Sequence, residues 1–160
     1  IMTYYSADPI MFSGGVSMVT ATRGDNDPEV GTRASVGDED YVFVYNTGNS
    51  QISPGYHATL SAVTGYSVVL TSTVELDIVV GVCKHATLTT ATYGWLMRRG
   101  FGSAIAPVDS VVVTGAIFTV GAAGVVQPKT VSTGYAGPVL GKAMGSGHSG
   151  LSFDAYWNVL

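Results

Sequence analysis

Short runs of alternating hydrophobic and polar residues fill most of the chain, and glycine, proline, serine or asparagine separates one run from the next. No stretch keeps the i, i+3, i+4, i+7 apolar spacing of an amphipathic helix, whereas valine and threonine, which favour strands, are abundant. The clearest strand is Tyr41–Tyr45, and a turn at Asn46–Ser50 ends it. Further strands are predicted at 56–63, 66–74, 75–85, 93–99, 110–114, 116–120, 124–127, 134–143 and 151–159. This pattern predicts an all-β fold, either a small antiparallel β-barrel or a sandwich.

The first forty residues differ from the rest of the chain. They are richer in polar and turn-forming residues, and their acidic side chains gather at 25–29 and 38–40. Charge gathered in this way is typical of solvated segments. We therefore predict an extended N-terminal arm with one or two weak strands over residues 1–40, and the β-barrel or sandwich body over residues 41–160.

The composition narrows the class of protein. The chain has 160 residues, of which 46% are hydrophobic and only 11% charged, against about 25% charged residues in ordinary soluble domains. This hydrophobicity excludes a disordered chain, and the net charge of −4 excludes a protein that binds nucleic acid through its charge. Cys83 is the only cysteine, so an intrachain disulfide framework is excluded too. A body this poor in charge favours self-association, and we expect a homo-oligomer, a trimer before a dimer.

One stretch raises the question of a membrane span. From Ser110 to Pro128 no residue is charged, and this length could cross a bilayer as a helix. The stretch contains three glycines and is dominated by β-branched residues, which favour two paired strands instead. The N-terminus shows neither the basic nor the apolar region of a signal peptide. We therefore expect no membrane association.

Sequence motifs that could carry chemistry are incomplete. Gly145–Gly150 matches G-x-G-x-x-G, but too little chain follows for the second strand of a nucleotide-binding unit, so a hairpin loop is the better interpretation. Asp25–Glu29 lacks the glycine and the final glutamate of an EF-hand loop, leaving a solvated loop or an irregular calcium site. Cys83 and His85 would share one face of a predicted strand, but two ligands do not close a metal site. We expect no enzyme, no metal and no cofactor.

The segment Tyr93–Gly100 is the richest in residues that occur at protein–protein contacts. It combines tyrosine, tryptophan, methionine and two arginines. Trp95 could lie either in the core or at an interface, whereas Arg98 and Arg99 are expected at a surface or an interface.

Several short motifs together resemble the family of phage capsid decoration (cement) proteins, over about residues 30–160. They are Val80-Gly-Val-Cys83 followed by Tyr93-Gly-Trp95 and Gly100, Val30-Gly-Thr-Arg33 followed by Tyr41–Asn46, and Val139–Ala143 before a final strand. The resemblance implies a β-rich domain, often trimeric with an extended arm, that is made in the host cytoplasm and binds the outer surface of the virion. It also implies a mechanical role, in which the protein clamps neighbouring subunits of the major capsid protein.

On this interpretation the candidate capsid or subunit contacts are aromatic and arginine side chains of the arm and of the segment 93–99. They are Tyr4, Tyr5, Arg23, Arg33, Tyr93, Trp95, Arg98 and Arg99. Two other hypotheses remain open. One is a host- or carbohydrate-binding β-sandwich such as a head-fibre domain, in which Tyr4, Tyr5, Tyr135, Tyr156 and Trp157 could stack on sugars. The other is a small enzyme on a β-barrel, for which the sequence offers no site.

Overall fold

The computed structural model describes residues 4–6, 15–25, 27–61, 65–72, 78–129 and 138–159. Across these residues it contains fourteen β-strands, two short 3₁₀ turns and no α-helix, so the predicted all-β fold is confirmed. The strands are β1 (Tyr4–Ser6), β2 (Val19–Thr20), β3 (Arg33–Val36), β4 (Glu39–Asn46), β5 (His57–Leu60), β6 (Ser67–Leu70), β7 (Val79–Val82), β8 (Tyr93–Ile105), β9 (Val111–Val112), β10 (Ile117–Val120), β11 (Val126–Pro128), β12 (Gly141–Ala143), β13 (Gly147–His148) and β14 (Ser152–Asn158). The 3₁₀ turns are η1 (Gly15–Ser17) and η2 (Ala122–Gly124).

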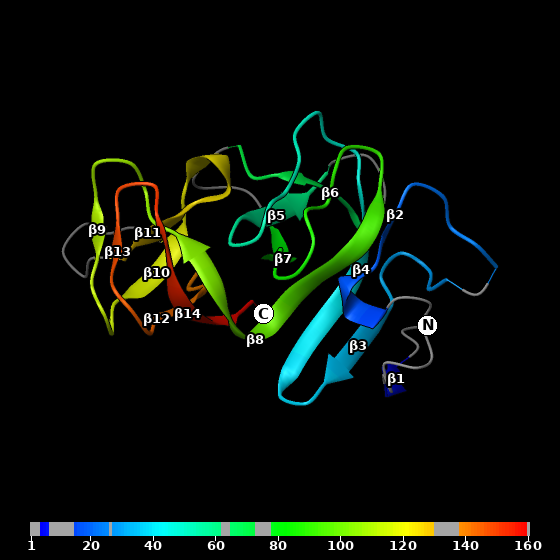
Figure 1. The fold of residues 1–160 in the computed structure, drawn as a ribbon, viewed down its shortest axis with the longest axis horizontal. Helices are drawn as coiled ribbons and strands as arrows, with labels where there is room; N and C mark the ends of the chain where they lie inside the picture. The colour runs from blue at the N-terminus through cyan, green and yellow to red at the C-terminus, as the bar shows by residue number, and fades with distance from the viewer. Residues whose placement is uncertain are drawn as a thin grey trace.

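Five of these strands close into a barrel (Figure 1). Antiparallel pairs run from β6 to β5, from β5 to β7, from β7 to β8 and from β8 to β4. The ring closes through a parallel pair between β4 and β6, because the chain crosses to β5 before it returns beside β4. The barrel interior is filled by alternate, mostly small aliphatic residues of its strands, among them Val42, Val44, Ala58, Val68 and Leu96.

A second sheet extends from the barrel. The far half of β8 pairs with β14, which pairs with β12, and the order continues through β10 to β11. In Figure 1 this sheet and the separate β9–β13 ribbon lie on the opposite side of the molecule from β1 and β3. One hydrophobic cluster joins Phe43 and Trp95 of the barrel wall to Phe118 and Trp157 of the second sheet. The two parts therefore share a core.

Strand β8 is the element that connects both parts. The sequence predicts a strand over 93–99, whereas β8 continues to Ile105. The difference arises at Gly100, whose backbone φ of +132° suits glycine and whose substitution by any larger residue would place a Cβ 2.7 Å from Glu39 Cγ. Glycine here permits close packing of the strand against β4 rather than ending it.

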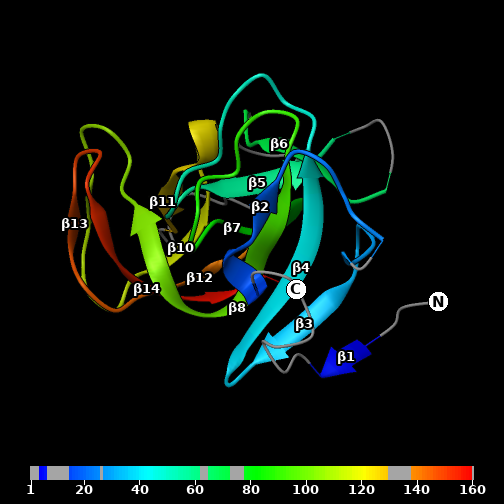
Figure 2. The same cartoon turned by 45° about the vertical axis from the view of Figure 1, so that its right-hand side comes forward.

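The N-terminal forty residues contribute strands to the same sheet system. β3 and β4 form a hairpin that turns at Gly37, where φ is +60°. β2 pairs with β8, and β1 adds to β3 in parallel at the margin of the molecule (Figure 2). The division into an arm and a body stays a prediction.

The sequence predicts one strand over 75–85, whereas the structure has β7 only at Val79–Val82, and residues 73–77 lie outside the described part. The placement of Cys83 and His85 on one strand face is wrong, because the chain bends after β7 and leaves Cys83 buried and His85 exposed. The paired strands expected within 110–128 are present as the antiparallel pair β10–β11, while β9 pairs with β13. No helix in the described residues is long and apolar enough to cross a membrane.

Candidate interaction surfaces

The residues with reactive side chains do not gather into a metal-binding cluster in the described part of the chain. The Cys83 thiol is buried and donates a hydrogen bond to the carbonyl oxygen of Ala86 at 3.2 Å. Burial raises the pKa of Cys83 to about 11, outweighing a backbone hydrogen bond that lowers it. The group is therefore a neutral thiol at physiological pH, which suits packing rather than nucleophilic chemistry.

A polar network that the sequence did not reveal links β4 to the segment after β7. The Tyr41 hydroxyl donates to Glu39 Oε2 at 2.5 Å, and it lies 2.9 Å from His85 Nε2, which must then be the donor. Lys84 Nζ forms an ion pair with the other Glu39 oxygen. Burial by itself raises the pKa of Glu39, but the hydrogen bonds from Lys84 and Tyr41 and the nearby positive charges leave it lowered. No sequence signal points to this network, because Glu39 and Lys84 lie far apart along the chain.

The pKa shifts of Tyr41 and His85 indicate that the network has a structural role. Burial and the Glu39 carboxylate raise the pKa of Tyr41 far above its usual range, so its hydroxyl stays protonated. The partial burial of the His85 ring and the charge of Lys84 lower the pKa of His85, although the negative charge of Glu39 acts in the opposite direction. A protonated tyrosine and a neutral histidine hold the ion pair in place, and the network fastens the start of β4 to the segment that follows β7.

Of the predicted contacts, four lie along β8. Trp95 is only 6% exposed and packs on Phe43, with ring centroids 5.1 Å apart, so in this chain it belongs to the core. Tyr93 is half-buried and stacks on Tyr45, 4.5 Å between centroids. Val16 of η1, the 3₁₀ turn before β2, packs on the hydrophobic cluster that contains Trp95.

Arg98 and Arg99 face opposite sides of β8, as neighbours in a strand must. Arg98 is half-buried, and its Nη2 donates to the carbonyl oxygen of Val159 at 3.3 Å. Arg99 is exposed, and its Nε lies 3.8 Å from Asp40 Oδ2. An exposed pair at this distance contributes little to stability, so Arg99 remains available to a partner.

The remaining predicted contacts lie in the N-terminal forty residues. Arg23 is exposed in a loop, and Arg33 opens β3 and is half-buried. The register of β1 places Tyr4 opposite Arg33 and Tyr5 opposite Ala34. The tyrosine side chains lie outside the described part, so the structure brings these residues together by backbone position.

The tyrosines and tryptophan predicted to stack on sugars do not form one surface. Trp157 is fully buried, and its Nε1–H donates to the carbonyl oxygen of Ser103 at 3.1 Å, so its assignment to a sugar site is wrong. The alternation along β14 explains this, because Phe153, Ala155 and Trp157 share the buried face of the strand. Tyr156 lies on the opposite face, and Tyr135 lies outside the described residues.

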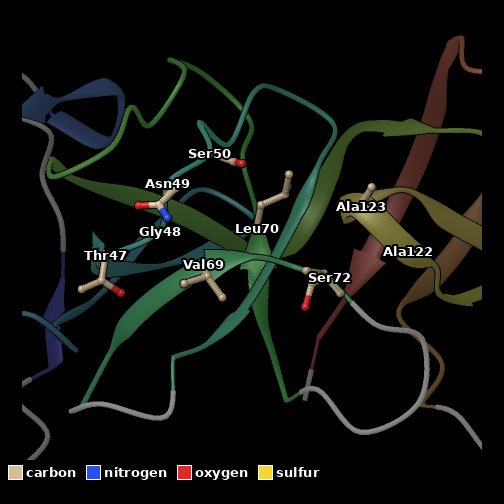
Figure 3. Close-up of a pocket in the computed structure, with 10 residues that line it drawn as sticks. Thr47, Gly48, Asn49, Ser50, Val69, Leu70, Ser72, Ala122 and Ala123 are labelled. Atoms are coloured by element: carbon tan, nitrogen blue, oxygen red, sulfur yellow. The ribbon is translucent and has the colours of Figure 1, made fainter.

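An open groove of about 650 Å³ lies between the end of β4, the end of β6 and η2 (Figure 3). Its lining consists of small or aliphatic uncharged side chains: Thr47, Gly48, Asn49, Ser50, Val69, Leu70, Thr71, Ser72, Ala122 and Ala123. Buried Asn46 shapes one wall, since its amide nitrogen reaches the carbonyl oxygens of Ser50, Leu88 and Thr89 and its oxygen accepts from the Gly48 N–H. The groove offers hydrogen bonds but no aromatic ring.

A smaller pocket of about 300 Å³ lies on the outer wall of the barrel. Three tyrosines dominate its lining, which consists of Val30, Tyr45, Gly65, Tyr66, Ser67 and Tyr93. Sequence reasoning selected Tyr93 as a contact but missed Tyr45 and Tyr66. Tyr45 was predictable as a strand residue, but nothing in the sequence shows that it lies beside Tyr66.

Comparison with known proteins supports the fold. The chain is similar in structure to the "head fiber gp8.5 N base" of bacteriophage phi29, with a TM-score of 0.51 and 13% sequence identity. The similarity covers 74% of this chain and 94% of that one. No protein-family model and no curated protein sequence matches this chain.

Proposed function

We propose that this chain is a structural virion protein that binds the outer surface of a phage capsid, as a decoration (cement) protein does. The observation that carries this proposal is the shared fold, since the structural neighbour is the base of a phage head fiber and almost all of it is covered. The short motifs in residues 30–160 that resemble decoration proteins support it independently. A role of this kind requires extended contact surfaces and no reactive centre.

The exposed side of the second sheet is the surface that suits such a contact best. Strand register places Ile117 opposite Lys142, Lys142 opposite Tyr156, and Tyr156 opposite Phe101. Residues directly opposite each other across a sheet point to the same side, so the four side chains form one row across β10, β12, β14 and β8. Arg99 lies two residues before Phe101 and therefore belongs to the same side of β8.

The chemistry of this row is typical of a binding surface. Phe101 is 57% exposed, and its ring contacts Tyr156 edge to face with centroids 5.0 Å apart. Two aromatic rings held in this way lose little conformational entropy when a partner covers them. Lys142 is exposed and has no ion pair in the described part of the chain. The row therefore fits a capsid surface that presents an apolar patch beside an acidic group.

A capsid repeats its subunits by symmetry, so moderate contacts at each site add up to strong attachment. We extend the proposal to the predicted contacts: a homotrimer sits on the major capsid protein, and Tyr4, Tyr5, Arg23 and Arg33 contact a neighbouring subunit. Deletion of residues 2–30 should then weaken binding to heads. Full occupancy by the truncated protein would contradict a role for the arm.

The test is binding of the purified protein to phage heads that lack it, measured by co-sedimentation. Phe101→Ser should weaken binding about 30-fold, which corresponds to the loss of one central contact residue. Val113→Ser is the matched control, because Val113 is 58% exposed and follows β9, which pairs with β13 and not with a strand of the row. Absence of binding by the unaltered protein would refute the proposal, and equal effects of the two substitutions would refute the surface.

The base of a head fibre is the second candidate function, and the structural neighbour favours it. The two functions differ in what binding does to the head. A cement protein joins adjacent subunits, so decorated heads should resist heating better than bare heads. A fibre base needs only to attach, and occupied heads should then melt at the temperature of bare heads.

A further inference from the structure

We propose that the tyrosine-lined pocket on the barrel wall binds a single neutral saccharide ring, a function separate from attachment to the capsid. The pocket is lined by the end of β4, by β6 and by the start of β8, whereas the row around Phe101 belongs to the second sheet. In Figure 2 the second sheet, with β10, β12 and β14, lies to one side of the strands β4 and β6. Both surfaces could therefore be occupied in the same molecule.

The barrel register builds the pocket floor. Tyr45 of β4 lies opposite Tyr93 of β8 on one side and opposite Ser67 of β6 on the other. The three side chains form a row on the outside of the barrel, because the neighbouring residues Val44 and Val68 fill its interior. The rings of Tyr45 and Tyr93 are 4.5 Å apart and inclined by 36°, so each restricts the other.

Tyr66 provides a wall, and Gly31 holds it in position. A Cβ at residue 31 would lie 2.5 Å from Tyr66 Cδ2, and Gly31 has a φ of +93°. Only glycine allows the Tyr66 ring to lie this close to the backbone. The Tyr45 N–H also donates to the Tyr66 carbonyl oxygen at 3.3 Å. The wall and the floor are therefore positioned before any ligand arrives.

The unused hydrogen-bonding capacity points to a polar ligand. Tyr45, Tyr66 and Tyr93 are all half-buried, yet no hydrogen bond joins any of their hydroxyls to another residue in the described part of the chain. No lining residue is charged. A site with three phenol groups, one serine hydroxyl and aromatic faces matches a molecule that has hydroxyls around an apolar C–H face.

A pyranose ring has that chemistry, and one ring suits a pocket of about 300 Å³. The larger groove beside η2 has hydroxyls but no aromatic ring, so it lacks the stacking surface. A proline-rich peptide also packs on aromatic rings, but it requires an extended groove rather than a small pocket. The observations therefore favour a saccharide.

The experiment is saturation-transfer NMR of the whole chain with glucose, galactose, mannose, rhamnose, N-acetylglucosamine and N-acetylgalactosamine, each tested alone. A glycan array and ¹⁵N-resolved shift mapping accompany it. We expect transfer to at least one of these sugars, with amide shift changes at Tyr66 and Ser67. Tyr66→Ala should abolish the transfer. Tyr66→Phe, which keeps the ring and hence the fold, should weaken binding about tenfold by the loss of a hydroxyl contact.

The matched control is Tyr156→Phe, which removes a tyrosine hydroxyl on the second sheet and should leave sugar binding unchanged. No transfer from any of the six sugars together with a silent array would overturn the inference. So would shift changes at Tyr66 caused by a polyproline decamer and by no sugar, because the pocket would then be a peptide site. Saccharide binding and head binding are measured separately, so the failure of one leaves the other standing.

Discussion

Buried Asn46 allows a direct test of how the loop after β4 is held. Its side chain is fully buried, with the amide nitrogen 3.0 Å from the Ser50 and Leu88 carbonyl oxygens and 3.2 Å from that of Thr89. The Gly48 N–H donates to its oxygen at 3.0 Å. Asn46→Asp keeps the shape of the side chain and the bond from Gly48, but it replaces a two-proton donor with a carboxyl group that faces three carbonyl oxygens.

The cost follows from the protonation state of the new carboxyl. If the carboxyl were ionised, the oxygen that replaces the amide nitrogen would face three carbonyl oxygens in a buried site, so the folded protein should bind a proton there instead. Keeping a carboxyl of ordinary pKa protonated at pH 7 costs about 4 kcal/mol, since each pH unit above the pKa costs about 1.4 kcal/mol. The protonated group still lacks one of the two amide donors, a loss of about 1 kcal/mol. Asn46→Asp should therefore lower the free energy of unfolding by about 5 kcal/mol at pH 7.

The sign of the pH dependence distinguishes this mechanism from a packing defect. In the folded protein the pKa of the introduced carboxyl lies above its value in the unfolded chain. The cost of protonation is therefore absent at pH values where the carboxyl is protonated in both the folded and the unfolded protein. It grows as the pH rises from about 4 towards 7. At pH 4 the loss relative to the unaltered protein should shrink to about 1–2 kcal/mol.

Urea unfolding at pH 4, 5.5 and 7 provides the measurement, with the unaltered protein as reference at each pH. Asn49→Asp is the control, because Asn49 is exposed in the same loop and its substitution should change stability by less than about 0.5 kcal/mol. Equal losses for the two variants at pH 7, or a loss for Asn46→Asp that does not change with pH, would refute the reasoning.

Three further predictions concern packing and titration. Gly141→Ala should prevent proper folding, because the new Cβ would lie 2.2 Å from the Tyr156 carbonyl oxygen. Gly145→Ala is the control and should fold, because its Cβ would have no neighbour closer than 3.6 Å. Circular dichroism and thermal melting compare the two variants. Cys83 should react with a thiol reagent at pH 7 only when urea unfolds the chain, and rapid labelling of the folded protein would contradict its burial and raised pKa. The lowered pKa of Glu39 means that its contribution to stability is fully present above its ordinary value of 4.5 and is lost as the pH falls from there through the lowered pKa of the folded state. Melting curves should therefore show Glu39→Gln less stable than the unaltered protein at pH 7, by a margin that shrinks as the pH falls below 4.5.

Local sequence patterns predicted where strands occur better than they predicted where each strand begins and ends. The strand at Tyr41–Tyr45 was predictable because consecutive apolar and aromatic residues end at a turn, and β4 includes it. The end of β8 was not predictable in the same way. Gly100 and Gly102 normally indicate a break, and only contact with Glu39 and Met97 shows that they permit close packing instead.

Burial was harder to predict than strand formation for the large side chains. Trp157 and Tyr156 are neighbours in a strand, and sequence composition assigns both to the class that binds at surfaces. The structure buries Trp157 against Phe118 and leaves Tyr156 on the other side beside Phe101. Which face of β14 turns inward depends on the strands that pair with it, and those pairings join residues far apart in the chain.

The sequence by itself determined that the chain is all-β, because alternation with a period of two and the abundance of valine and threonine act within a few residues. Its low charge also predicted contact surfaces rather than a solvated exterior. Tertiary structure alone decided the closure of the barrel, the Glu39 network, the row at Phe101 and the pocket of three tyrosines. Each of these depends on the register between strands that are distant in sequence, and register results from the packing of the whole core.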